Sequence, residues 1–214
     1  MNILEQNKTL YLWDLADTLF SERWDKGGTG ILNYDAYIES LGYDLKTIDA
    51  KTYEWLYEQP FRDGRMILGL MPGFKEILTW AKHNAVFTTG NIEQIDWRAE
   101  VFIKKEVGDV RKFFEKIYST FDYGNTNQKT EQMFLDILRK ESMNGRSALV
   151  YADNRLDNCE QFKQAAQKYS AIKTQLYHIN SNALKIREIA TNFFEVSGLP
   201  ELLKNEQNRS LKIS

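Results

Sequence analysis

The chain has 214 residues, and its 28 Lys and Arg nearly balance its 30 Asp and Glu, which leaves a formal net charge of −2. This length suits one domain, or one domain with a modest insertion. Because 43% of the residues are hydrophobic, the chain can form a core, and disorder of the whole chain is excluded. The balanced charge argues against a nucleic-acid-binding surface, which needs a basic excess.

Cysteine use and the lack of long apolar stretches indicate the compartment. Cys159 is the only cysteine, so no disulfide can form within the chain, which fits a reducing environment. The sequence does not open on a basic segment followed by an apolar stretch, and it contains no window of about 18 apolar residues. We therefore expect a cytoplasmic protein that has no signal peptide and does not contact a membrane.

Five short apolar runs do not alternate with polar residues, which is typical of strands covered on both faces of a parallel sheet. In chain order these runs are Leu10–Trp13, Ala85–Phe87, Lys116–Ser119, Ala148–Ala152 and Gln175–Ile179. Apolar residues recur at helical spacing in four further segments: Phe74–Ala81, Ile95–Val107, Thr130–Lys140 and Asn158–Tyr169. Strands that alternate with helices predict an α/β fold with a parallel sheet.

One long stretch between the first and second predicted strands breaks this alternation. Tyr34–Leu41 and Ile48–Tyr57 have helical spacing and are rich in aromatic residues, and Gly27–Gly30 has the composition of a hinge. A loop of this length without secondary structure is uncommon in a compact domain. We therefore expect a small helical subdomain inserted after the first strand.

Polar residues gather where the predicted strands end, and ligands of parallel sheets bind beyond these carboxyl ends. The first run leads into Asp14, the second into Thr88 and the fourth into Asp153 and Asp157, while Lys129 opens the helix before the fourth run. Clustered carboxylates repel one another unless a cation joins them, and a hard cation such as Mg²⁺ prefers oxygen ligands. A lysine and a hydroxyl beside that cation form a phosphate site, and the remaining carboxylate can attack phosphorus.

This arrangement resembles the haloacid dehalogenase (HAD) superfamily, whose motifs occur here in order over nearly the whole chain. The matches are Asp14, Thr18 and Leu19 in the first motif, Thr88 in the second, Lys129 in the third, and Asp153 with Asp157 in the fourth. Pro72-Gly73 also resembles the start of the helix before the family's second motif. The resemblance implies an α/β fold, a Rossmann-like parallel sheet in three layers with a small all-helical cap after the first strand. The core is expected at residues 1–20 and 72–214, and the cap at residues 21–71.

The resemblance also implies a Mg²⁺-dependent phosphohydrolase that forms an aspartyl phosphate on Asp14. The implied catalytic residues are Asp14, Thr18, Thr88 and Lys129. The implied metal ligands are Asp14, the backbone carbonyl of Ala16, Asp153 and Asp157, of which Asp157 either supports the metal or orients Lys129. The implied substrate-binding residues are Thr89, Gly90, Asn91 and Lys129. The expected partner is a small phosphorylated metabolite, while the substrate itself and the oligomeric state stay open.

One position departs from the phosphatases of this family. Their first motif has a second Asp that protonates the leaving group and then activates water, and this position is Ala16 here. The neighbouring Asp17 falls on a variable position, and on an extended chain its side chain points away from the face of Asp14. Loss of a positioned general acid–base typically costs ~10²–10⁴-fold in rate. We therefore expect a phosphohydrolase that is slow or restricted to good leaving groups such as acyl phosphates, unless the alanine is an introduced substitution.

Three alternatives for the function stay open at this point. Phosphonatase-type C–P hydrolases of the superfamily also have Asp-x-Ala in the first motif and use a cap lysine, for which Lys26, Lys46 and Lys51 are available. A catalytically degenerate member would bind a phosphorylated ligand or partner without turnover. A dehalogenase is the weakest alternative, because it would not need the pair Asp153 and Asp157.

Overall fold

The computed structural model describes the chain in five stretches, namely residues 7–24, 34–45, 47–89, 109–124 and 128–211. The chain divides into two compact units. The larger unit comprises Met1–Phe20 and Leu70–Ser214, and the smaller unit comprises Ser21–Gly69. The second boundary therefore lies two residues before the boundary expected from the sequence. No helix among the described residues is long and apolar enough to cross a membrane.

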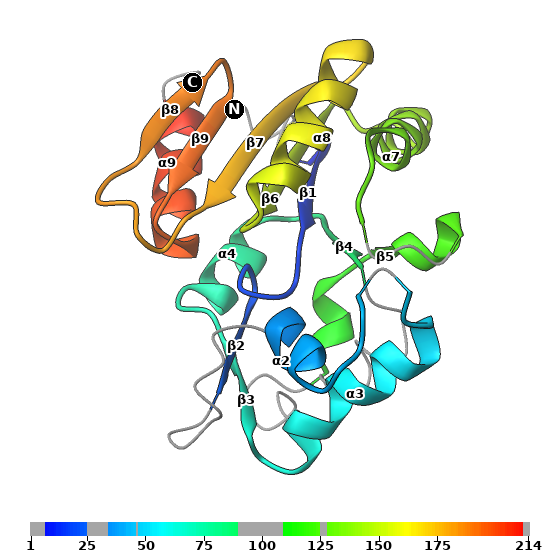
Figure 1. Ribbon diagram of the computed structural model, residues 1–214. Coiled ribbons are helices and arrows are strands. Elements are labelled where there is room, and N and C mark those ends of the chain that lie inside the picture. The colour runs from blue at the N-terminus through cyan, green and yellow to red at the C-terminus, as the bar shows by residue number, and fades with distance from the viewer. Residues whose placement is uncertain (1–6, 25–33, 46, 90–108, 125–127, 212–214) are drawn as a thin grey trace. The chain divides into compact units, whose positions relative to one another are not determined.

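A seven-stranded sheet forms the centre of the larger unit, in the order β5–β4–β1–β6–β7–β9–β8 (Figure 1). The strands are β1 Thr9–Trp13, β4 Asn84–Thr88, β5 Lys116–Ser119, β6 Ala148–Asp153, β7 Lys173–Ile179, β8 Arg187–Ala190 and β9 Phe193–Val196. All neighbouring strands are parallel except β8 and β9, which form an antiparallel pair at one edge. The five predicted strands are confirmed, whereas β8 and β9 were not predicted.

Helices cover both faces of this sheet. They are α4 Phe74–Trp80, α7 Glu131–Met143, α8 Leu156–Lys168 and α9 Leu199–Leu211, and two short 3₁₀ helices lie at Val110–Phe113 and Thr120–Tyr123. The predicted helices at 74–81, 130–140 and 158–169 are confirmed by α4, α7 and α8. The predicted helix at 95–107 lies outside the described residues, and α9 was not predicted.

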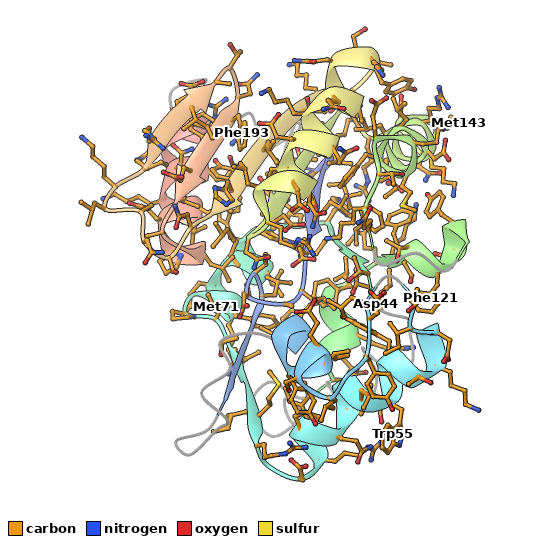
Figure 2. The ribbon with its side chains drawn as sticks, in the orientation of Figure 1. Asp44, Trp55, Met71, Phe121, Met143 and Phe193 are labelled. Atoms are coloured by element: carbon orange, nitrogen blue, oxygen red, sulfur yellow. The ribbon has the colours of Figure 1, made fainter. Side chains whose placement is uncertain are left out.

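The alternation of side chains along β1 explains the three layers. Leu10 and Leu12 point to one face and join a buried cluster with Phe134 of α7 and Phe162 of α8. Tyr11 points to the opposite face, where its ring meets Trp80 of α4 edge to face and its hydroxyl donates to Glu206 of α9. Every residue of β1 and of β4 is buried, as the unbroken apolar runs predict. Figure 2 shows the side chains that fill the space between the sheet and its helices.

The smaller unit contains α2 Tyr34–Ser40, α3 Ala50–Arg62 and a two-stranded sheet of β2 Phe20–Trp24 and β3 Met66–Leu70. The first residue of β2, Phe20, and the last residue of β3, Leu70, belong to the larger unit. The expectation of an all-helical insertion is therefore wrong in this respect. Asp49 starts α3 as its N-cap, because its side chain accepts a hydrogen bond from the backbone nitrogen of Thr52 at 3.0 Å. The expected hinge at Gly27–Gly30 lies outside the described residues. The core of this unit is formed by Tyr37, Ile38, Leu56, Phe61 and Met66.

Candidate functional site

The adjacent parallel strands β1 and β6 bring Asp14 and Asp153 to the same edge of the sheet. Trp13, the last residue of β1, pairs with Ala152 of β6, and the backbone nitrogen of Asp14 donates to the Ala152 carbonyl at 3.0 Å. Asp153 is the last residue of β6 and is fully buried, and the side chain of Asp14 is 13% exposed. The carboxyl end of the sheet therefore holds two buried carboxylates side by side.

Lys129 bridges these two carboxylates. It lies two residues before α7, and its ammonium nitrogen Nζ lies 2.5 Å from Asp14 Oδ1 and 2.9 Å from Asp153 Oδ2. The lysine side chain is completely buried. Asp14 and Asp153, which are 115 and 24 positions from Lys129 along the chain, thus form one cluster with it.

The electrostatics of the cluster show a shortage of positive charge. The pKa of Asp14 is raised to about 7, because burial and, after it, the negative charge of Asp153 raise it more than Lys129 lowers it. Burial alone would lower the pKa of Lys129, but the two carboxylates outweigh it and raise the pKa, so the lysine stays protonated. One ammonium shared by two carboxylates leaves an excess of negative charge that a further cation would relieve.

Two residues that the sequence analysis did not select complete the hydrogen bonds of Asp153. The Tyr151 hydroxyl donates to Asp153 Oδ2, and Nδ2 of Asn158 in α8 donates to the same oxygen at 3.0 Å. The other oxygen, Oδ1, accepts from the backbone nitrogen of Arg155 at 2.7 Å. The spacing of Tyr151 offers a signal, since residues two apart on a strand share a face. The sequence contains no such signal for Asn158, because its contact with Asp153 depends on where α8 packs.

The structure does not bring Asp157 into this cluster. Its carboxylate pairs with Arg155 at 2.7 Å, and the two side chains are 63% and 53% exposed. The Arg155 guanidinium lowers the pKa of Asp157. Within the described stretches, no three His, Cys, Asp or Glu side chains gather where they could hold a metal ion. The contacts of Asp157 thus give no support to the expectation that it binds the metal or orients Lys129.

Threonines expected in the site connect its loops. Thr18 is fully buried, and its Oγ1 accepts a hydrogen bond from the backbone nitrogen of Asn154 at 3.1 Å, which joins the turn after β1 to the loop after β6. Thr88 is the last residue of β4 and is 6% exposed. The carbonyl of Thr89 accepts from Thr120 Oγ1 at 3.2 Å. The two remaining expected substrate-binding residues, Gly90 and Asn91, lie outside the described residues.

A tight turn after Asp14 contains Ala16. The backbone nitrogens of Leu19 and Phe20 both donate to the Leu15 carbonyl at 2.9 Å. Asp17 has a φ of 54°, in the left-handed region that few residues other than glycine adopt, and it is exposed. The expectation that Asp17 lies on an extended chain is therefore wrong, because these local hydrogen bonds fold the segment back. The turn has no carboxyl group at residue 16.

Solved structures with the same fold show a low sequence identity to this chain. UTR4 protein from Saccharomyces cerevisiae matches with a TM-score of 0.51 and 11% identity, over 89% of this chain and 97% of that chain. A haloacid dehalogenase-like family hydrolase from Xanthomonas campestris matches with a TM-score of 0.50 and 14% identity, over 96% and 94%. A HAD family enzyme from Bacteroides thetaiotaomicron matches with a TM-score of 0.51 and 14% identity, over 82% and 95%.

Neither a scan of protein-family models nor a search of curated proteins finds a match. At the identities of the structural matches, the similarity shows the fold alone. The fold nevertheless agrees with the motifs, because the strands that carry Asp14, Thr88 and Asp153 lie next to one another at the centre of the sheet. The chain therefore has the haloacid dehalogenase-like fold that its motifs predict.

Proposed function

We propose that this chain is a Mg²⁺-dependent phosphohydrolase, which transfers the phosphoryl group of a small phosphorylated metabolite to Asp14 and then to water. The observation that carries the proposal is the buried contact of the Lys129 ammonium with both Asp14 and Asp153. A carboxylate nucleophile beside a fixed cation is what attack on a negatively charged phosphoryl group requires.

The donor set fits Mg²⁺. The carboxylates of Asp14 and Asp153, together with the backbone carbonyl of Ala16, would hold the ion through the oxygen ligands that it prefers. The raised pKa of Asp14, about 7, supports this assignment, because it reflects two buried carboxylates that share one ammonium. When bound, Mg²⁺ would offset this excess charge and the charge of the phosphoryl group. The Bacteroides enzyme has been crystallised in complex with magnesium and inorganic phosphate.

The residues of the chain then divide the chemistry as follows. A carboxylate oxygen of Asp14 attacks phosphorus and forms an Asp14–O–P bond, while the bond from phosphorus to the leaving oxygen breaks and its electron pair stays on that oxygen. Lys129 and Thr88 offset the charge on the phosphoryl oxygens. Water then hydrolyses the acyl phosphate, which releases inorganic phosphate and restores the Asp14 carboxylate.

Ala16 limits which substrates react quickly. The leaving oxygen must take its proton from solvent, since residue 16 provides no carboxyl group, and the attacking water lacks a base at that position. Substrates whose leaving group is stable as an anion, such as acyl phosphates, are therefore favoured over alkyl phosphates. Ala16 also favours the second candidate, a protein that binds a phosphorylated ligand but does not hydrolyse it. For the C–P hydrolase alternative, Lys26 and Lys46 lie outside the described residues.

Phosphate release separates these possibilities. We would measure it with acetyl phosphate and a panel of alkyl phosphates, with and without Mg²⁺, for the chain and for Asp14→Asn and Ala16→Asp. The chain should release phosphate mainly from acetyl phosphate, only with Mg²⁺, and Asp14→Asn should release none. Ala16→Asp should accelerate alkyl phosphate hydrolysis by ~10²–10⁴-fold. Release that does not depend on Mg²⁺ or on Asp14 would contradict the proposal, and silence of both the chain and Ala16→Asp would favour a binding protein.

A further inference from the structure

Tyr151 lies at the centre of the hydrogen bonds that hold Lys129. The lysine Nζ is 3.2 Å from the Tyr151 hydroxyl oxygen, in addition to its contacts with Asp14 and Asp153. An ammonium has three N–H donors, so these three acceptors satisfy all of them. The ring of Phe87 also lies near the ammonium, with its centroid 5.3 Å from Nζ.

The Tyr151 hydroxyl also acts on Asp153. It accepts from Lys129 and donates to Asp153 Oδ2, which accepts from Lys129 Nζ and Asn158 Nδ2 as well. Three donors thus hold Oδ2 on the inner side of the site. The remaining oxygen, Oδ1, accepts one bond from the backbone nitrogen of Arg155. The Tyr151 hydroxyl is therefore bonded to both the cation and the carboxylate.

The packing of the Tyr151 ring fixes the position of this hydroxyl. The side chain is fully buried, and its ring packs against both Phe134 of α7 and Phe162 of α8, with centroid distances of 4.9 and 5.0 Å. Both helices thus hold the ring, which has little freedom to rotate its oxygen away. The strand position two residues before Asp153 then aims the hydroxyl at the site.

We propose that Tyr151 is a positioning residue of this site, whose hydroxyl holds the Lys129 ammonium and the Asp153 carboxylate in fixed relative positions before a ligand binds. Its effect on Lys129 rests on the geometry alone. Its effect on phosphoryl transfer rests on the proposed function, in which Lys129 meets the phosphoryl oxygens and Asp153 is a ligand of Mg²⁺.

A matched control exists on the opposite face of the sheet. Tyr11 of β1 is also fully buried, and its hydroxyl donates to the buried carboxylate of Glu206 at 2.8 Å. Glu206 also accepts from the hydroxyl of Tyr177 at 2.7 Å and from the Gln175 amide. Tyr11→Phe and Tyr151→Phe therefore each remove one hydroxyl donor to a buried carboxylate that keeps other donors. A merely structural role of Tyr151 predicts that both variants lose stability and keep the rate of phosphoryl transfer.

The first measurement follows the Lys129 ammonium by ¹⁵N-edited NMR in the metal-free protein. A buried ammonium with three acceptors exchanges its protons slowly with water and gives a resolved signal, which Lys129→Met identifies by its loss. Tyr151→Phe should shift or broaden this signal, because one acceptor is gone, while Tyr11→Phe should leave it unchanged. Thermal unfolding of both variants checks that each is folded. An unchanged lysine signal in folded Tyr151→Phe would overturn the proposal.

The second measurement is the rate at which acetyl phosphate phosphorylates Asp14 in a single turnover with Mg²⁺. Tyr151→Phe should lower the saturating rate by about 10- to 100-fold, the range expected for a hydrogen bond to charged groups. The half-saturating acetyl phosphate concentration should stay the same, and Tyr11→Phe should keep both values. If Tyr151→Phe shifts the lysine signal but keeps the full rate, the catalytic part of the proposal fails. If the unchanged chain is not phosphorylated although its lysine signal behaves as predicted, the proposed function fails and the positioning of Lys129 stands.

Discussion

Two carboxylate clusters lie on opposite faces of one sheet, and they differ in the groups that donate to the carboxylates. On the face of α7 and α8, Asp14 and Asp153 share the ammonium of Lys129. On the face of α9, Glu206 accepts hydrogen bonds from the neutral side chains of Tyr11, Tyr177 and Gln175. Burial of a carboxylate therefore does not by itself mark a functional site in this fold.

What separates the clusters is the ammonium that two carboxylates share in the first cluster, and the place of each cluster on the sheet. Asp14 and Asp153 follow or end their strands, at the edge where ligands of parallel sheets bind, and one cation cannot neutralise both. The donors to Glu206 come from within β1 and β7, where the carboxylate links α9 to the middle of the sheet. Under the proposed function, the first cluster receives Mg²⁺ and a phosphoryl group, whereas the contacts of the second cluster attach α9 to the sheet.

The largest effect is expected from removal of the cation of the first cluster. Lys129→Met leaves two buried carboxylates without their shared partner, which should lower the free energy of unfolding of the metal-free protein by about 3–5 kcal/mol. Chemical denaturation measures this loss, and Mg²⁺ should restore part of it. Lys116→Met is the control, because Lys116 also contacts a buried carboxylate, Glu141, at 2.5 Å but is itself 41% exposed. Lys116→Met should cost at most about 1 kcal/mol of unfolding free energy. An equal loss in both variants would contradict the claim that the two carboxylates depend on the Lys129 ammonium.

An intermediate effect, confined to stability, is expected from the second cluster. Glu206→Ala leaves the buried hydroxyls of Tyr11 and Tyr177 without this acceptor, which should cost about 1–3 kcal/mol of unfolding free energy. Glu206→Gln keeps an acceptor oxygen at the same place and should cost less. The rate of phosphate release should be unaltered in both folded variants. A fall in that rate at saturating Mg²⁺ would contradict the expectation that the Glu206 cluster affects stability alone.

The smallest effect is expected at the link between the loops of the site. Thr18→Val removes the Oγ1 that accepts from the backbone nitrogen of Asn154, and should cost about 0.5–1.5 kcal/mol of stability. Thr18→Ser keeps the hydroxyl and should retain the hydrogen bond, so the comparison of the two variants by thermal unfolding isolates it. A loss of the same size in Thr18→Ser would point to packing of the methyl group instead.

The sequence predicts the residues of the cluster well because topology alone brings them together. Asp14 and Asp153 follow apolar runs that can only be inner parallel strands, and the carboxyl ends of such strands meet at one edge. Lys129 joins them because it precedes the helix that leads into β6. Side-chain identity and strand order thus suffice for these three residues.

Other features depend on three-dimensional detail that a linear pattern does not contain. In the sequence, Tyr151 resembles the other apolar residues of its strand. Its hydroxyl contacts Lys129 only because the Tyr151 side chain lies on the face of β6 where Lys129 packs. The left-handed conformation of Asp17 follows from hydrogen bonds to the Leu15 carbonyl within a turn. Asp157 has the expected spacing, yet the nearby Arg155 pairs with it at the surface. The strand β8 is short, exposed and charged, and so resembles a loop in sequence.

The central claim is that Asp14, Lys129 and Asp153 together accept a phosphoryl group. The most direct test is binding of beryllium fluoride, which mimics a phosphoryl group on a carboxylate, followed by ¹⁹F NMR with Mg²⁺ present. The chain should give a bound fluoride signal that disappears when Mg²⁺ is removed, and Asp14→Asn should give none. A chain that shows no bound signal at saturating Mg²⁺, or an Asp14→Asn variant that shows the same signal, would contradict the account.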